Sequence, residues 1–187
     1  MIKLIVGLGN PGLQYQRTRH NAGFLFLDGL VSVNSGDKWQ LNRQFLGDLS
    51  CFSYYGGRVI ALKPVTYMNK SGLAVEKVIS FYKIKPEEIL VIHDELELSV
   101  GQVKMKFSGG HAGHNGLRDI IARIGSANFY RLRIGVGRPS VGSVADYVLS
   151  TPSFDEQQAI DKVCRVIAVD ARELFLGEFD VFNQRFS

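Results

Sequence analysis

The distribution of hydrophobic and polar positions divides the chain into short strands and amphipathic helices. Six apolar or alternating runs are typical of strands, and they cover residues 2–8, 46–54, 58–63, 89–92, 103–107 and 130–136. Four segments repeat their apolar residues at helical spacing, at residues 21–33, 73–82, 117–124 and 153–175. The last of these opens with Ser153 and Glu156, the two partners of a capping box.

Strands and helices alternate along the chain, and no linker, repeat or low-complexity segment separates them. The short continuous run at 89–92 is typical of a strand that is covered on both faces. This order predicts the α/β class, as a single three-layer α/β/α domain over residues 1–187. We expect a mixed, mostly parallel twisted sheet between the helical layers.

Composition narrows the class of protein only a little. The 187 residues are 45% apolar and 21% charged, as in ordinary globular proteins. No apolar stretch approaches the roughly 18 residues that cross a bilayer, and the first residues lack the features of a secretory leader, so we expect a cytoplasmic protein with no membrane partner. Two cysteines are too few for a disulfide framework, and Cys164 is expected to be a buried, inert thiol. The net charge of +4 is compatible with a polyanionic partner.

The first strand runs into a glycine-rich turn, GLGNPG at residues 7–12, which matches the G-x-G-x-x-G pattern of dinucleotide-binding loops. That fingerprint needs a helix directly after the third glycine, and an acidic residue about 20 residues later at the end of a second strand. Residues 14–18 have no helical period, and neither Asp28 nor Asp37 ends a strand. We therefore interpret the turn as a device that presents Asn10.

Polar side chains collect after the predicted strands, where ligands bind in open α/β sheets. Four strand ends are followed by Asn10, Tyr15 and His20; by Tyr67, Met68 and Asn69; by His93, Asp94 and Glu95; and by His111, His114 and Asn115. We expect these side chains to converge on one rim of the sheet.

The rim has no serine in a G-x-S-x-G turn and no cysteine, so the expected nucleophile is water. An imidazole can deprotonate water near neutral pH, and a carboxylate partner fixes its tautomer. We favour His20 as this base and Asp94 as its partner, with asparagine amides holding a carbonyl group or its oxyanion.

Other interpretations of these residues remain open. His20 could be a surface or capping residue, Asp94 could cap a turn, and the asparagines could be turn residues or helix caps. The tyrosines and Met68 could belong to the core. A metal is the rival chemistry, with candidate ligands His93, Asp94, Glu95, His111 and His114. These residues form no H-E-x-x-H motif, and we predict no required metal or cofactor.

Basic residues favour an anionic partner. Lys104 and Lys106 share one face of a strand, and Arg131 and Arg133 share a face of another. Five more lie near the rim loops: Arg17, Arg19, Lys70, Arg118 and Arg138. Strand lysines usually only keep a surface solvated, but a cluster beside a hydrolytic rim favours contacts with nucleic-acid phosphates.

Five blocks along the chain resemble, in the same order, the bacterial-type peptidyl-tRNA hydrolases. They are VGLGNPGLQYQRTRHNAG at 6–23, KPVTYMNKSG at 63–72, ILVIHDELELSVGQVKMK at 89–106, GHNGLRDI at 113–120 and FYRLRIGVGRP at 129–139. The resemblance implies a monomeric, metal-independent esterase. It would hydrolyse the ester between a peptide and the 3′-terminal ribose of tRNA, releasing both for recycling during translation.

The resemblance also implies roles for individual residues. His20 would be the general base on water, Asp94 would hold it in its basic form, and Asn10 would help to distinguish N-blocked from free aminoacyl groups. The acylated 3′ end would be contacted by Tyr15, Tyr67, Asn69 and Asn115, in a groove lined by Met68 and His114. Lys106 and Arg133 would form a clamp on a phosphate of the acceptor stem.

Departures from the family pattern are small. Tyr67 stands where the family often has Phe, and His111 and Ala112 stand where small residues are common. We assign no role to His111, and the C-terminal tail does not match closely enough to define its part in tRNA docking. A metal-dependent hydrolase and a non-catalytic RNA-binding module are the alternative functions.

Overall fold

The computed structural model describes residues 1–34 and 36–186. In this part of the chain a seven-stranded sheet has the order β2-β3-β4-β1-β5-β7-β6. Its strands are β1 (Leu4–Gly7), β2 (Gln40–Asn42), β3 (Gly47–Tyr54), β4 (Gly57–Pro64), β5 (Ile89–Glu95), β6 (Val103–Phe107) and β7 (Tyr130–Gly135). The four central strands, β4, β1, β5 and β7, are parallel, whereas β3 and β6 run antiparallel beside them. The predicted mixed, mostly parallel sheet is confirmed.

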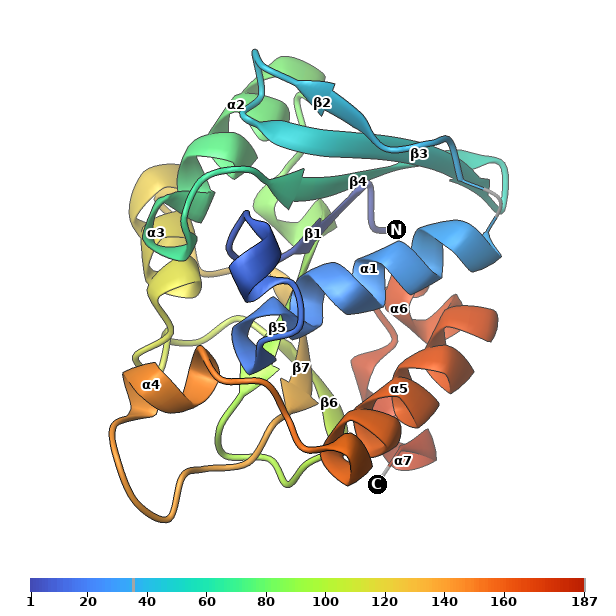
Figure 1. Ribbon diagram of the computed structural model, residues 1–187. Helices are drawn as coiled ribbons and strands as arrows, with labels where there is room; N and C mark the ends of the chain where they lie inside the picture. The colour runs from blue at the N-terminus through green and yellow to red at the C-terminus, as the bar shows by residue number, and fades with distance from the viewer. Residues whose placement is uncertain (35, 187) are drawn as a thin grey trace.

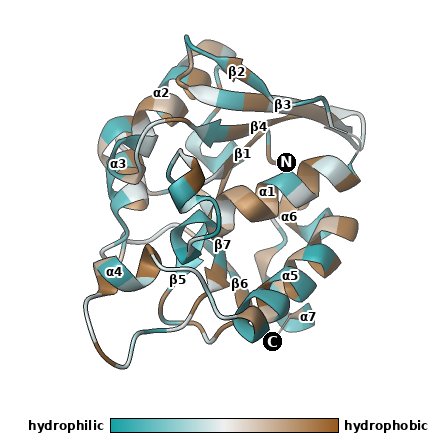
Figure 2. Cartoon of the chain, viewed as in Figure 1, coloured by the Kyte–Doolittle hydropathy of each residue, from teal (hydrophilic) through white to brown (hydrophobic). Residues whose placement is uncertain are grey.

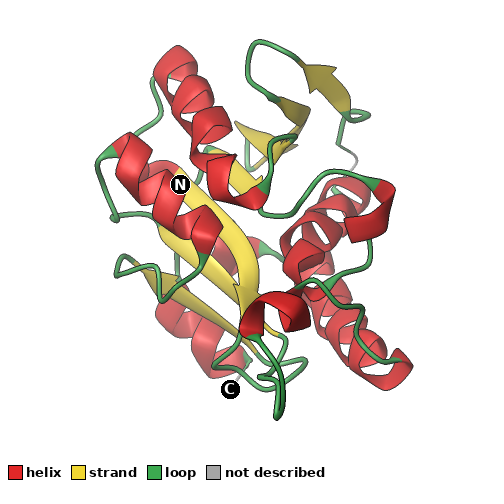
Figure 3. Cartoon of the chain, turned by 60° about the vertical axis from the view of Figure 1, so that its left-hand side comes forward, coloured by secondary structure: helices red, strands yellow, loops and turns green. Residues whose placement is uncertain are grey.

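Helices cover both faces of the sheet, as Figures 1 and 3 show. One layer consists of α1 (Ala22–Val33), α5 (Phe154–Val169), α6 (Arg172–Leu176) and α7 (Phe179–Arg185), and the other of α2 (Ser71–Tyr82) and α3 (Asn115–Ile124). Successive residues of β1 serve the two layers in turn, since Ile5 packs in the cluster with α1 and Val6 in the cluster with α2. Hydrophobic and hydrophilic residues alternate along α1 and α5, as amphipathic helices require (Figure 2). The three-layer α/β arrangement is therefore confirmed.

The glycine-rich turn works through close packing. Gly12 has a φ of 109°, and the short 3-10 helix η1 (Leu13–Tyr15) follows it instead of the long helix that a dinucleotide loop needs. Gly23, in the first turn of α1, lets this helix touch the strand ends. A Cβ atom at Gly23 would lie 2.3 Å from the carbonyl oxygen of Ile92 and 2.5 Å from the amide nitrogen of Leu8. This approach brings the residues just before α1 onto the end of β5.

The structure differs from the predicted elements in three respects. β5 continues to Glu95, so His93 and Asp94 lie in the strand and are buried. The helix predicted for 153–175 ends at Val169, because Asp170 leaves the helical region with φ −133° and ψ 79°, and α6 continues the same apolar stripe. Apart from the short 3-10 turns, the strand β2 and the helices α4 (Val144–Val148) and α7 were not predicted.

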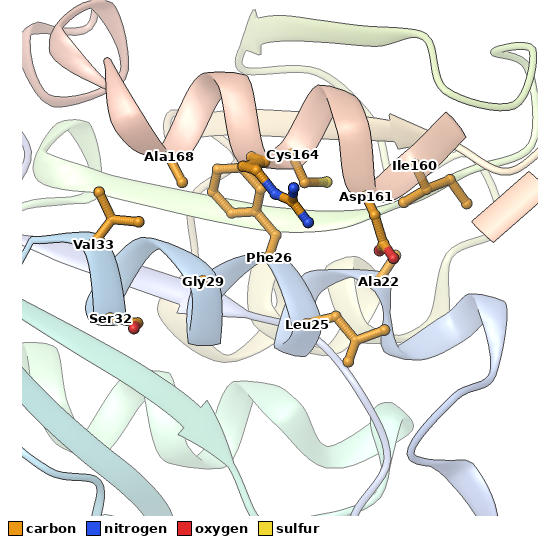
Figure 4. A pocket seen from close by; sticks show the side chains of 11 residues that line it. Ala22, Leu25, Phe26, Gly29, Ser32, Val33, Ile160, Asp161, Cys164 and Ala168 are labelled. Carbon is orange, nitrogen blue, oxygen red and sulfur yellow. The ribbon is translucent and has the colours of Figure 1, made fainter. Parts of the chain in front are cut away.

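Figure 4 shows the groove between α1 and α5, into which Phe26 and Cys164 point. The half-buried Cys164 packs against the core on this side of the sheet. Burial raises the pKa of its thiol to about 12, so Cys164 stays protonated and unreactive at neutral pH, although it is less buried than expected. Among the described helices, none has both the length and the apolar character required to cross a membrane.

Candidate functional site

His20 and Asp94 meet at the carboxyl end of β5. His20 lies in the 3-10 turn η2 (Arg19–Asn21), directly before α1. Its Nδ1 atom is 2.8 Å from Oδ1 of Asp94, and the two residues are only 9% and 4% exposed. Because a carboxylate oxygen accepts, Nδ1 of His20 carries the hydrogen, and Nε2 keeps its lone pair. This is the arrangement of a general base and the group that orients it.

His114 is a second donor to the same carboxylate oxygen. Its Nε2 lies 3.0 Å from Oδ1 of Asp94, while Nδ1 accepts the backbone N–H groups of Gly116 and Leu117. A neutral imidazole carries one N–H, so capping α3 through Nδ1 fixes the hydrogen on Nε2. His114 thereby joins the start of α3 to the carboxylate.

The electrostatics of this cluster keep Asp94 charged and His93 neutral. Burial alone would raise the pKa of the Asp94 carboxyl, but the charge interactions and hydrogen bonds of His20 and His114 outweigh burial and lower it. His93 donates from Nδ1 to the backbone carbonyl oxygen of Asp94 at 2.7 Å. Burial, followed by the charge of His114, lowers the pKa of His93 to about 3. At neutral pH the cluster therefore contains a charged Asp94 carboxylate, which accepts from His20 and His114, and an uncharged His93.

Asn10 is fixed on both its backbone and its side chain. Asn21 accepts from the Asn10 amide at 2.9 Å and donates to the Asn10 carbonyl oxygen at 3.0 Å. The side-chain Oδ1 of Asn10 accepts the backbone N–H of Met68 at 2.8 Å. Its donor end, Nδ2, has no hydrogen bond within the described part of the chain. Asn10 thus presents an oriented N–H group.

Met68 connects Asn10 to the histidine cluster. It lies in η3 (Met68–Lys70), and its sulfur packs where a side chain at position 116 would stand. A Cβ atom on Gly116 would be 2.6 Å from the Met68 sulfur and 3.2 Å from Cε1 of His114. The glycine therefore allows η3 and the first turn of α3 to meet beside the carboxylate.

A cavity of about 500 Å³ opens over this cluster. Its floor is formed by His20, His93 and Asp94, and its walls by the glycine-rich loop before α3, by β6 and β7, and by α4. Asn115, His114, Lys106 and Arg133 all line it. The structure thus brings six residues predicted to act in binding or catalysis around one space, those four together with His20 and Asp94.

The remaining predicted residues lie outside this cavity. Asn10 lines a neighbouring one, which it shares with Asn21. Tyr15 and Tyr67 pack edge to face, with ring centroids 6.4 Å apart, and Tyr67 is 57% exposed. Asn69 is exposed in η3. None of these four residues lines the cavity of His20 and Asp94.

The basic residues separate into two kinds. Lys106 is exposed, and Arg133 is partly exposed with Nη1 3.6 Å from a Glu95 oxygen, so both can meet an anion. Arg131 and Arg19, in contrast, are buried at 3% and 7% exposure. Arg131 donates to the carbonyl oxygens of the loop before α3, and Arg19 donates to the chain after α4. Arg19, one of the basic residues expected near the rim loops, thus has its Nη1 and Nη2 atoms bonded inside the protein.

Three ligand atoms, one each from His20, Asp94 and His114, lie within 4.8 Å of one another, so a metal site has to be considered. A metal-ligating nitrogen must have no hydrogen. Nε2 of His114 carries one, because its Nδ1 accepts from the first turn of α3. The hydrogen bonds around His114 therefore do not fit a metal ion at this position.

Sequence reasoning missed two residues that hold the site. Asn21 stands at the N-cap position of α1, where asparagine usually caps the helix, but its side chain makes no cap bond and binds Asn10 instead. Arg19 is expected from the sequence only to lie near the rim loops, and its side chain is buried. No pattern in the sequence indicates either role, since both depend on contacts with loops that are distant in the sequence.

The chain is similar along its length to proteins named peptidyl-tRNA hydrolase. The family model described as peptidyl-tRNA hydrolase matches residues 4–187. The peptidyl-tRNA hydrolase of Bordetella parapertussis is 54% identical over 89% of this chain and 80% of that protein, and that of Pseudomonas fluorescens is 49% identical over 96% and 93%. The crystal structure of peptidyl-tRNA hydrolase from Acinetobacter baumannii has a TM-score of 0.89 at 42% identity, covering 95% of this chain and 90% of that one.

Proposed function

The chain belongs to the peptidyl-tRNA hydrolase family, and from this premise we propose how its site breaks the ester of peptidyl-tRNA. The protein is an enzyme that hydrolyses peptidyl-tRNA. In our proposal, residues 1–187 act as one catalytic domain, with the reaction at the His20–Asp94 pair.

The first step is attack by water on the ester carbonyl carbon. The lone pair on Nε2 of His20 takes a proton from the water as its oxygen bonds to the carbon. The imidazolium that forms is stabilised by the Asp94 carboxylate, 2.8 Å from Nδ1. His114 holds this carboxylate in place through its bond to the same oxygen. Positioned general bases of this kind contribute about 10²–10⁴-fold to rate.

The second step is collapse of the tetrahedral intermediate. Its negative oxygen accepts from asparagine amides of the site. Asn10, whose side chain is oriented by the backbone N–H of Met68, helps to distinguish N-blocked from free aminoacyl groups. The carbon–oxygen bond to the ribose then breaks, and His20 returns its proton to the leaving 3′ oxygen. The products are tRNA with a free 3′ hydroxyl group and a peptide with a free carboxylate.

We assign substrate binding to residues on both sides of the His20–Asp94 pair. Tyr15, Tyr67, Met68 and Asn69 hold the acylated 3′ end from the Asn10 side, with Asn115 and His114 facing them. Lys106 and Arg133 line the same cavity and bind a phosphate of the acceptor stem. We further propose that the protein works as a monomer in the cytoplasm, where translation supplies its substrate.

The observation that carries the proposal is the buried hydrogen bond between His20 and Asp94. The test is release of the blocked amino acid from N-acetylaminoacyl-tRNA. His20→Ala is expected to lower turnover by at least about 10²-fold, because the base is lost. His111→Ala is the matched control, since His111 lines the same cavity but its side chain, among the described residues, accepts only the backbone N–H of Gly113. Wild-type turnover by His20→Ala would refute the assignment of the base.

A further inference from the structure

Arg19, directly before His20, is a buried cation whose side-chain donors turn away from the catalytic cavity. Its Nη1 atom donates to Oγ of Ser150 at 2.6 Å and to the carbonyl oxygen of Thr151 at 3.2 Å. Its Nη2 atom is 2.8 Å from Oε2 of Glu156, and its side chain is only 8% exposed. The backbone N–H of Arg19 also donates to the Ser150 carbonyl oxygen, at 3.1 Å.

The guanidinium group also stacks on α4, the short helix that forms a wall of the cavity. The carbon at the centre of the group lies 4.1 Å from the centroid of the Tyr147 ring. The hydroxyl group of Tyr147 donates to the carbonyl oxygen of Val136, just after β7, at 2.7 Å. Val144 and Val148, on the same helix, line the cavity above His20 and Asp94. Arg19 therefore joins the turn of His20 to the wall that faces the substrate.

We propose that Arg19 is a positioning residue, which fixes the orientation of His20 toward Asp94 by fastening η2 to α4 and to the start of α5. The turn that carries His20 is only three residues long, and its N-cap residue, Thr18, makes no side-chain cap bond. Its position thus depends on what its residues contact. The Asp94 carboxylate holds His20 and the backbone of Asn10 holds Asn21, while α4 and the residues after it hold Arg19.

The geometry requires arginine and not simply a positive charge. Two nitrogens of the planar group serve different partners, Ser150 and Thr151 on one side and Glu156 on the other, while its face covers Tyr147. A lysine ammonium would have neither the fork nor the flat face. Oε2 of Glu156 in turn accepts the backbone N–H of Ser153 at 2.7 Å. The carboxylate that binds Arg19 is therefore itself fixed at the N-terminus of α5.

The inference rests on His20 being the base, and the experiment measures two quantities on the full chain. The first is kcat and KM for N-acetylaminoacyl-tRNA. The second is the NMR signal of the hydrogen-bonded Nδ1–H proton of His20 in protein labelled with ¹⁵N-histidine. For Arg19→Met we expect kcat to fall about 10-fold to 100-fold, as small misplacements of catalytic groups do, with a smaller change in KM. The His20 proton signal should be lost to exchange with water.

Two controls are available: a second histidine signal in the same Arg19→Met protein, and a second arginine variant. His93 also has a buried Nδ1–H donor, bonded to the Asp94 carbonyl oxygen, and its signal should persist in Arg19→Met. Arg185 has a comparable clamp far from the cavity: it binds Glu173 at 3.2 Å and lies 5.1 Å from the Phe186 ring centroid. Arg185→Met should keep both proton signals and the wild-type kcat.

Each outcome decides the proposal. Wild-type kcat in Arg19→Met, or a lower kcat with the His20 signal intact, would overturn it. If Arg19→Met does not fold, Tyr147→Leu carries the same test, because it removes the stacked ring and its bond to Val136; it should weaken the His20 signal and lower kcat. Failure of the base assignment looks different, since His20→Ala would then remain active whatever Arg19 does.

Discussion

Lowering the pH should destabilise the folded protein through His93, which is buried and uncharged. Its pKa is lowered from the ordinary value of 6.5 to about 3, mainly by burial and then by the charge of His114. The unfolded chain binds a proton at His93 below pH 6.5, and the folded protein does not, so stability falls as pH decreases from about 6.5 towards about 3. At about 1.36 kcal/mol per pH unit, acidification from pH 7 to pH 5 costs about 2 kcal/mol at this residue.

The assay is urea unfolding at pH 7 and pH 5, followed by the fluorescence of Trp39, the one tryptophan in the sequence. His93→Asn keeps a donor near the position of Nδ1 but cannot titrate. It should therefore lose about 2 kcal/mol less than the wild type between the two pH values. His111→Asn removes a histidine from the glycine-rich loop and is the matched control, which should keep the wild-type loss. Equal losses for wild type and His93→Asn would show that the native state accepts a proton at His93 without cost, and would refute the reasoning.

Three other changes test the site. Asp94→Asn should lower kcat by about 10²–10⁴-fold with little change in KM, because an amide that donates to Nδ1 of His20 selects the wrong tautomer; an unchanged kcat in steady-state kinetics would contradict this. Gly116→Ala should destabilise the protein by about 1–3 kcal/mol in urea unfolding, since its Cβ would lie 2.6 Å from the Met68 sulfur, and a change near zero would show that this contact is loose. Overnight dialysis against EDTA should leave turnover unchanged, and its loss with recovery on adding zinc would favour the metal-dependent alternative.

The architecture was predictable because residues that face the core must be apolar, so each buried strand or helix shows its own spacing of apolar residues in the sequence. Buried strands such as β1 and β5 contain continuous apolar runs, and α1 and α2 show the helical spacing of apolar residues, since their apolar faces pack against the sheet. β2 escaped prediction because it is a three-residue edge strand with no buried residue. The break at Asp170 escaped it because the apolar stripe continues across the break into α6.

The candidate site was predictable only in part. The rule that ligands bind beyond the carboxyl ends of the strands is enough to suggest that His20 and Asp94, 74 residues apart, share a rim. It cannot indicate that His114 uses its two nitrogens for different tasks, capping α3 and holding Asp94. The rule also cannot show that the Arg19 side chain is buried, because this depends on its hydrogen bond to Ser150, which is 131 residues away in the sequence.

His20 and Asp94 should act as one unit, and a double-mutant cycle under single-turnover conditions measures this directly. The rates of N-acetylaminoacyl-tRNA hydrolysis are compared for wild type, His20→Ala, Asp94→Asn and the double variant. If Asp94 serves only to orient and stabilise His20, adding Asp94→Asn to His20→Ala leaves the rate unchanged. A double variant slower than His20→Ala by the full factor of Asp94→Asn alone would mean that the two residues act independently.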